Sequence, residues 1–156
     1  LHSLNVACHC YVLASKAKLV PEEAFLAGLL HKIGALPIIA MSDQKRSYTL
    51  EDLNKTIDEI HPMLGENILT HWQFPRSIAD VPQNYLDAGR YVNKVDLCDI
   101  VSIANNHVCR VEDFVPWEDT SSLERMGWHS SNVESEFNNL SMEIQIAHDV
   151  FEFRAT

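Results

Sequence analysis

Residues 24–34 read AFLAGLLHKIG, an apolar helical segment that places a histidine and a lysine side by side near its end. Val20-Pro21-Glu22-Glu23 precedes it, and proline in the first turn followed by two acids indicates a helix start. The apolar residues predict a buried helix face, and Gly34 is available as its stop. The chemistry of the segment depends on whether His31 binds a metal or fills the core, and on the role of Lys32.

The rest of the chain shows the same helical periodicity. Thr49 and Asp52 form a capping-box pattern, and His61-Pro62 interrupts the helix that follows. Residues 109–130 form an irregular acidic segment with one helical turn near 122–126. No stretch predicts a strand, so we expect an all-α, single-domain helical bundle over residues 1–156. The expected helices cover about residues 1–19, 21–33, 49–60, 62–72, 95–108 and 131–153, with a short apolar segment at 36–41.

The first helix carries Cys8-His9-Cys10, which looks like a metal motif. Residues two apart on a helix point about 200° away from each other, so these two thiols do not chelate one ion. We expect structural cysteines instead. Asn5, His9 and Lys16 are expected to form the polar stripe of this helix.

The composition excludes several classes of partner. The 156 residues include 12 Lys and Arg against 22 Asp and Glu, a formal charge of −10. An acidic surface without a basic cluster repels nucleic acid and anionic membranes. The longest apolar run, residues 24–30, is far shorter than the roughly 20 residues that span a bilayer. The four cysteines lie within helical patterns, which predicts reduced thiols and a cytoplasmic protein.

Common catalytic motifs are missing from the sequence: there is no G-x-S-x-G elbow, glycine-rich phosphate loop or H-E-x-x-H. Asp96 and Asp99 are neighbours on one helix, where a pair of carboxylates is conceivable. A solvated acidic face is the expected interpretation, because nothing nearby in the sequence would raise the pKa of either group.

The histidines taken together match a known family. His2-Ser3 and residues 24–34 resemble the opening of the HD superfamily of metal-dependent phosphohydrolases. Residues 61–75, HPMLGENILTHWQFP, resemble the HD-related output domain, or HDOD, and residues 102–105 are similar to the late helix of that family. The resemblance covers about residues 1–108 and implies a helical bundle of the HD-domain type.

In catalytic members of the superfamily, histidines and aspartates hold one or two divalent ions that activate water against a phosphate ester. The resemblance places His2 and His31 at ligand positions, but the aspartate after the second histidine is Lys32 here, and the late-helix aspartate is Asn105. A paired-histidine position falls near Asn84-Tyr85 in a loose alignment. Lysine adds a positive charge where a cation would lie, and asparagine offers an oxygen without charge.

We therefore expect no catalytic residues, no cofactor and no metal; His2 and His31 are the ligands if a metal binds at all. The expected vestigial site consists of His2, His31, Lys32, His61 and Asn105. The favoured function is a non-catalytic bacterial signal-transduction module that contacts protein partners or fused signalling domains. The alternatives are a metal-dependent phosphohydrolase with altered ligands, and a sensor of a nucleotide or second messenger. The family usually carries an N-terminal helical subdomain, so the chain is expected to be the C-terminal part of a larger HDOD region.

Overall fold

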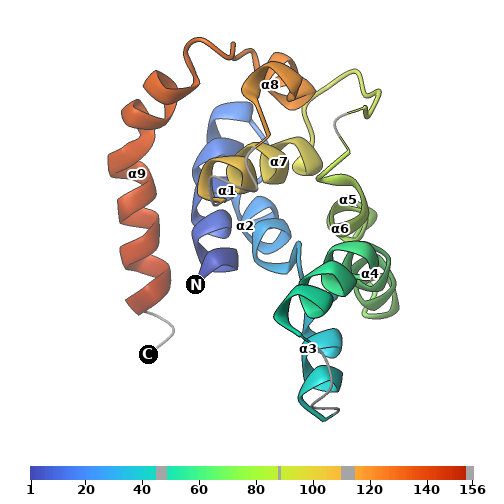
Figure 1. The fold of residues 1–156 in the computed structure, drawn as a ribbon. Helices are drawn as coiled ribbons and strands as arrows, with labels where there is room; N and C mark the ends of the chain where they lie inside the picture. The colour runs from blue at the N-terminus through green and yellow to red at the C-terminus, as the bar shows by residue number, and fades with distance from the viewer. Residues whose placement is uncertain (45–48, 88, 110–114, 154–156) are drawn as a thin grey trace.

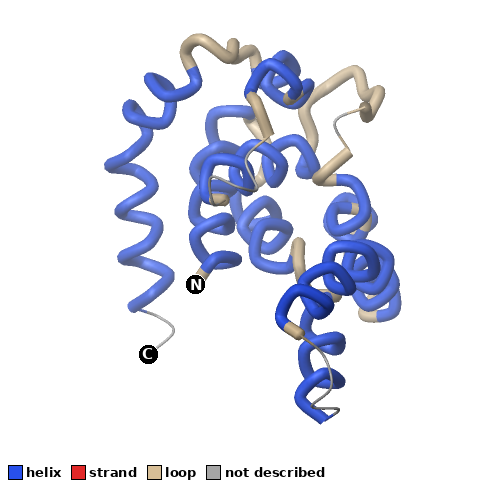
Figure 2. The backbone as a smooth tube through the Cα atoms, viewed as in Figure 1, coloured by secondary structure: helices blue, strands red, loops and turns tan. Residues whose placement is uncertain are grey.

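A computed structural model describes the chain except for residues 45–48, 88, 110–114 and 154–156. Every regular element in the described residues is a helix, as Figures 1 and 2 show, and the all-α prediction is confirmed. The elements are α1 (His2–Ala17), α2 (Pro21–Leu30), α3 (Ala35–Gln44), α4 (Leu50–His71), α5 (Arg76–Ala79), α6 (Val81–Asn84), α7 (Leu97–Val108), η2 (Trp117–Asp119), α8 (Ser121–Met126) and α9 (Val133–Phe153).

Helix α1 lies at the centre of the fold and packs against α2, α7 and α9 (Figure 1). Because neighbours cover it on several sides, His9 is buried, and its prediction as part of a polar stripe is wrong. Its ring lies 5.2 Å from that of His107 on α7 and 6.0 Å from that of Phe137 on α9. Cys8 and Cys10 are fully buried free thiols, and burial raises the pKa of Cys8 to about 11. These thiols are packing residues, as expected.

Helix α4 begins as predicted and ends much later than predicted. The Asp52 backbone N–H donates to the Thr49 hydroxyl at 3.1 Å, which confirms the capping box. The helix then continues through Pro62 to His71, so the predicted break at His61-Pro62 is wrong. Proline removes a single backbone N–H from the helix. Tertiary packing offsets that loss, because His61, Gly65 and Leu69 on either side of Pro62 are all buried.

Gly34 has a different role from the helix stop that the sequence suggests. It lies in the turn between α2 and α3, outside the residues with positive φ. A Cβ atom at this position would lie 2.2 Å from the His61 carbonyl oxygen and 2.6 Å from the Gly65 nitrogen. Glycine is therefore required by the close approach of this turn to the backbone of α4.

Replacing Gly34 with alanine is expected to lower the free energy of unfolding by about 1–3 kcal/mol, because backbone atoms must move to make room. Urea denaturation measures the change. Gly89→Ala is the matched control, since its Cβ would meet only the Asp87 side chain, at 3.3 Å. Equal losses in the two variants would contradict this role of Gly34.

The described part of the acidic segment packs on the core. Trp117 in η2, Leu123 in α8 and Trp128 after α8 are buried, and the predicted turn near residues 122–126 is confirmed as α8. Residues 110–114 of that segment lie outside the described residues. The packing of α8 also changes the interpretation of Asp99, which is fully buried rather than part of a solvated acidic face.

One helical stretch of the described residues, Pro21–Ser42, is long and apolar enough to cross a membrane, with a mean hydropathy of 1.7. Core helices and signal sequences pass the same test of length and composition, so the finding is weak evidence for a membrane span. A turn at residues 31–34 separates α2 from α3 inside the stretch.

Candidate functional site

The five residues of the expected vestigial site come from four separate parts of the chain. His2 begins α1, His31 and Lys32 follow α2, His61 lies in α4 and Asn105 lies in α7. The imidazole rings of the first two histidines are 5.7 Å apart. Four of the five line a pocket of about 600 Å³, and His31 is not among its lining residues. Its lining residues are His2, Asn5, Lys32, Asp58, His61, Tyr85, Leu86, Asn105, Val108 and Cys109.

His31 is a fully buried, neutral imidazole. Its Nδ1 lies 2.6 Å from the Gly28 carbonyl oxygen, so Nδ1 carries the proton and donates it. Burial is the main cause that lowers the pKa of His31 to about 3. Its Nε2 is buried and has no hydrogen-bond partner among the described residues. The ring therefore keeps one unprotonated nitrogen without a partner.

The side chains of His2 and Asn105 are hydrogen-bonded to each other. The His2 Nε2 lies 3.1 Å from the Asn105 Oδ1, an arrangement in which the imidazole N–H donates to the amide oxygen. A nitrogen that carries this proton cannot ligate a metal. The amide at the position of the expected aspartate thus also engages one of the two ring nitrogens of His2.

Tyr85 joins the two buried histidines and was not predicted as a site residue. Its ring lies 5.1 Å from that of His31 and 6.3 Å from that of His61. The Tyr85 hydroxyl and the His61 Nδ1 are buried without a hydrogen-bond partner in the described part of the chain. The only sequence signal for Tyr85 is its place near the paired-histidine position of the family. The Tyr85 ring therefore lies beside both imidazoles.

Lys32 and Asp58 give the pocket one charge of each sign. Lys32 is half-buried, and its ammonium contributes to lowering the pKa of both His31 and His61, after the larger effect of burial. Asp58 opposes that effect at His61. The ion pairs of the described residues do not include either group. The sequence gives no signal for Asp58, because it lies on an ordinary exposed face of α4.

The donors at this site do not fit a water-activating divalent ion. Such an ion takes several oxygen or imidazole ligands and at least partial compensation of its charge. Here one imidazole nitrogen of His2 is hydrogen-bonded to the Asn105 amide, and Lys32 lines the same pocket. Nowhere in the described residues do three or more His, Cys, Asp or Glu side chains form a group that could hold a metal.

Comparison with known proteins identifies the fold and the family. The HDOD domain family matches residues 1–85, more than half of the chain. A candidate metal-dependent phosphohydrolase from Shewanella amazonensis SB2B is 24% identical, with a TM-score of 0.67 over 78% of this chain and 46% of the other. A candidate phosphohydrolase from the same organism is 17% identical, with a TM-score of 0.59 over 94% of this chain and 61% of the other.

These similarities confirm the prediction of an HD-type helical fold. The chain spans about half the length of the first structure and about three fifths of the second. At such identities, the likeness to the two structures shows the fold alone. No curated protein matches the chain.

Proposed function

This chain belongs to the HDOD domain family, and we propose that it is a non-catalytic bacterial signalling module that acts in the cytoplasm through contacts with protein partners or fused signalling domains. The observation that carries the proposal is the replacement of both expected carboxylates, by Lys32 beside the buried His31 and by Asn105 bonded to His2. A domain with these two residues has the fold of the superfamily but lacks two of the carboxylates that hold the metal in its catalytic members.

Electrostatics supports the proposal over metal-assisted hydrolysis. At a separation of about 4 Å and an effective dielectric constant of about 20, each unit charge changes the energy of a divalent ion by several kcal/mol. Replacing aspartate by lysine changes the local charge by two units in the unfavourable direction. A metal that is bound weakly or not at all cannot lower the pKa of a water to the neutral range.

The second candidate is a metal-dependent phosphohydrolase with altered ligands. One observation favours it: the Nε2 of His31 is unprotonated, buried and without a described partner, which is the state of a metal-binding imidazole. The two similar crystal structures are also named as candidate phosphohydrolases. A single free imidazole nitrogen is a much weaker argument than the two lost carboxylates.

Metal content and turnover test the proposal together. We expect the purified protein, incubated with Mn²⁺, Fe²⁺ or Mg²⁺ and desalted, to hold less than stoichiometric metal by elemental analysis. We also expect no hydrolysis of bis(p-nitrophenyl) phosphate. Restoring both carboxylates in a Lys32→Asp, Asn105→Asp variant should create Mn²⁺ binding, seen as a rise in melting temperature with Mn²⁺ concentration.

Lys55→Asp controls for the lysine substitution, since it makes the same two-unit charge change at an exposed position of α4, and it should not respond to Mn²⁺. Stoichiometric metal in the unmodified protein, together with turnover that is lost in His31→Ala, would establish the phosphohydrolase instead. A rise in melting temperature with a nucleotide, without turnover, would indicate a sensor.

A further inference from the structure

Three buried polar groups of the candidate site have no hydrogen-bond partner. Among the described residues, four buried side-chain nitrogen or oxygen atoms lack a partner, and three of them are the His31 Nε2, the His61 Nδ1 and the Tyr85 hydroxyl oxygen. The Tyr85 ring lies beside both imidazoles, so the three groups form one cluster. Buried polar groups in folded proteins nearly always have a partner. A cluster of three without one indicates a place where a bound molecule supplies the missing hydrogen bonds.

Two members of this cluster belong to the wall of the pocket at the candidate site. His61 and Tyr85 both line that pocket, which has a volume of about 600 Å³. Their side chains are 1% and 2% exposed, so they form its most buried part. Pockets of roughly 300 to 1,000 Å³ with a few convergent polar groups are the usual sites of small molecules. The pocket therefore has the size and the buried polar groups of a small-molecule site.

Two charges of opposite sign line the same pocket and do not pair with each other. Neither Lys32 nor Asp58 takes part in the ion pairs of the described residues. After the larger effect of burial, Lys32 lowers the pKa of His61 and Asp58 raises it, so both charges lie near this ring. Asp58 also adds to the effect of burial that raises the pKa of the Tyr85 hydroxyl. A molecule beside His61 and Tyr85 would therefore meet one ammonium group and one carboxylate.

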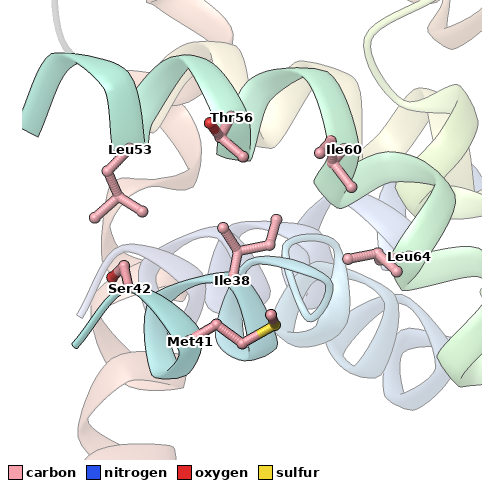
Figure 3. Close-up of a pocket in the computed structure, with 7 residues that line it drawn as sticks. All are labelled: Ile38, Met41, Ser42, Leu53, Thr56, Ile60 and Leu64. Carbon is pink, nitrogen blue, oxygen red and sulfur yellow. The ribbon is translucent and has the colours of Figure 1, made fainter. Parts of the chain in front are cut away.

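The groove between α3 and α4 lacks these features. It has a volume of about 300 Å³, and Figure 3 shows side chains from both helices facing the space between them. Its two polar lining residues are already bonded to their own helices. The Ser42 hydroxyl donates to the Ile39 carbonyl oxygen at 2.8 Å, and the Thr56 hydroxyl donates to the Asp52 carbonyl oxygen at 2.8 Å. The lining residues of this groove carry no charge and no unpartnered polar atom, so they define no ligand.

We propose that the pocket at the candidate site binds a small zwitterion of the class of free α-amino acids, with its carboxylate beside Lys32 and its ammonium group beside Asp58. The inference rests on the proposed function, because a signalling module without turnover can use this pocket to sense a ligand. The bound molecule supplies the hydrogen bonds that the His61 Nδ1 and the Tyr85 hydroxyl lack. Asn5 also lines the pocket and offers an amide that can donate and accept.

Charge and hydrogen bonding rank other ligands below this class. An oxyanion such as phosphate matches Lys32 but is repelled by Asp58, in a protein with a formal charge of −10. A polyamine matches Asp58 but is repelled by Lys32. An apolar ligand would leave the buried polar groups without partners. A zwitterion meets both charges and offers hydrogen bonds to the buried groups between its charged ends.

The probes are the standard L-amino acids, each tested at about 5 mM for its effect on the melting temperature of the purified protein. We expect at least one of them to raise the melting temperature and to bind saturably at one site in titration calorimetry. Two derivatives of that amino acid control for its charges. Its N-acetyl form lacks the ammonium group and its amide form lacks the carboxylate, so each should bind about tenfold more weakly or worse.

Two charge variants test where the amino acid binds. Lys32→Met and Asp58→Asn should each weaken its binding by about tenfold or more, because each removes the partner of one charged end. Lys94→Met and Asp149→Asn repeat these changes at exposed positions that do not line the pocket. Neither control should alter binding, and circular dichroism should show that all variants are folded.

Tyr85→Phe separates a role in binding from a role in the fold. The Tyr85 hydroxyl has no partner among the described residues, so its removal should leave the unliganded protein at least as stable in urea. The same variant should weaken binding of the amino acid by about fivefold or more. Tyr11→Phe repeats the change outside this pocket and should leave binding unchanged. A Tyr85→Phe variant that loses stability and binds as before would contradict the proposal.

Several other results would overturn it. These are no rise in melting temperature with any amino acid, binding that Lys32→Met and Asp58→Asn leave unchanged, and derivatives that bind as tightly as the amino acid itself. Binding of inorganic phosphate or a nucleotide in place of amino acids would assign the pocket to an anion. None of these results changes the metal and turnover measurements, so the proposed function is tested separately.

Discussion

Replacing Asp99 with alanine is expected to lower the free energy of unfolding by about 3–5 kcal/mol, because two largely buried arginines lose their shared partner. Asp99 is fully buried. Arg125 donates two hydrogen bonds to the Asp99 carboxylate, from Nε to Oδ2 at 2.9 Å and from Nη2 to Oδ1 at 2.7 Å. The Ser122 hydroxyl donates to Oδ1 at 3.0 Å, and Arg90 Nη1 lies 3.3 Å from the same oxygen.

The carboxylate also holds the start of α7. Asp96 and Asp99 form a capping box, in which each side chain accepts the backbone N–H of the other residue, at 3.1 and 3.2 Å. Arg90 pairs with Asp96 as well. One side chain therefore joins α7, α8 and the segment that contains Arg90. Its loss removes one of the two hydrogen bonds of the capping box, the hydrogen bonds from two arginines and a buried hydroxyl contact together.

Urea denaturation at pH 7 measures the effect, and Asp80→Ala is the matched control. Asp80 forms an ion pair with Arg76 at 3.3 Å, but the Arg76 side chain is 86% exposed, so the control should cost less than about 1 kcal/mol. Asp99→Asn keeps the shape of the side chain and should fall between the two. A loss in Asp99→Ala no larger than in Asp80→Ala would show that solvent replaces the two arginines.

The Asp99 cluster also shows where prediction from sequence ends. The capping relation is local, three residues apart, and the sequence already shows the two aspartates as neighbours on a helix. Arg90 and Arg125 lie 9 and 26 residues away from Asp99. No periodicity connects them, so the carboxylate looks solvated until α8 is placed. The same limit applies to His9. The periodicity of its helix predicts that it lies on the polar face, but α7 and α9 cover it.

The candidate site shows the opposite case, because family resemblance carries long-range information that periodicity lacks. His2, His31 and Asn105 are far apart in sequence. In the structure the rings of His2 and His31 lie 5.7 Å apart, and His2 is hydrogen-bonded to the Asn105 side-chain amide. Two further residues line the pocket and were not predicted as site residues: Asp58, which has no counterpart in the motif, and Tyr85, which falls near the paired-histidine position of the family. Family resemblance thus identifies the residues that stand at positions of a known motif. Residues outside the motif that line the same pocket can be identified only from the structure.

Acidification from pH 7 to pH 5 is expected to lower the free energy of unfolding by about 2 kcal/mol for each of His9 and His31. Burial is the main cause that lowers the pKa of His9 to about 4 and that of His31 to about 3, from an ordinary value of 6.5. At pH values between the folded pKa and 6.5, these histidines bind a proton in the unfolded chain but not in the folded chain. The stabilisation is therefore complete above about pH 6.5 and is lost progressively as the pH falls toward the folded pKa.

His61 and His107 act in the same direction, because burial is also the main cause that lowers the pKa of each. His107 stacks on Phe137 with ring centroids 3.6 Å apart, and His9 lies beside both rings, so protonation here weakens the contact of α9 with α1 and α7. The site pocket and the α9 contact should therefore both lose stability in mild acid.

Urea denaturation at half-unit steps of pH measures the dependence, and histidine variants separate its sources. His9→Gln cannot titrate, so it should reduce the loss between pH 7 and pH 5 by about 2 kcal/mol, whatever its effect on stability at pH 7. His129→Gln repeats the substitution at an exposed position far along the chain from His9 and serves as its comparison. A pH dependence that is the same in the unmodified protein and in both variants would mean that His9 does not resist protonation in the folded state, and that acid acts on this fold through other groups.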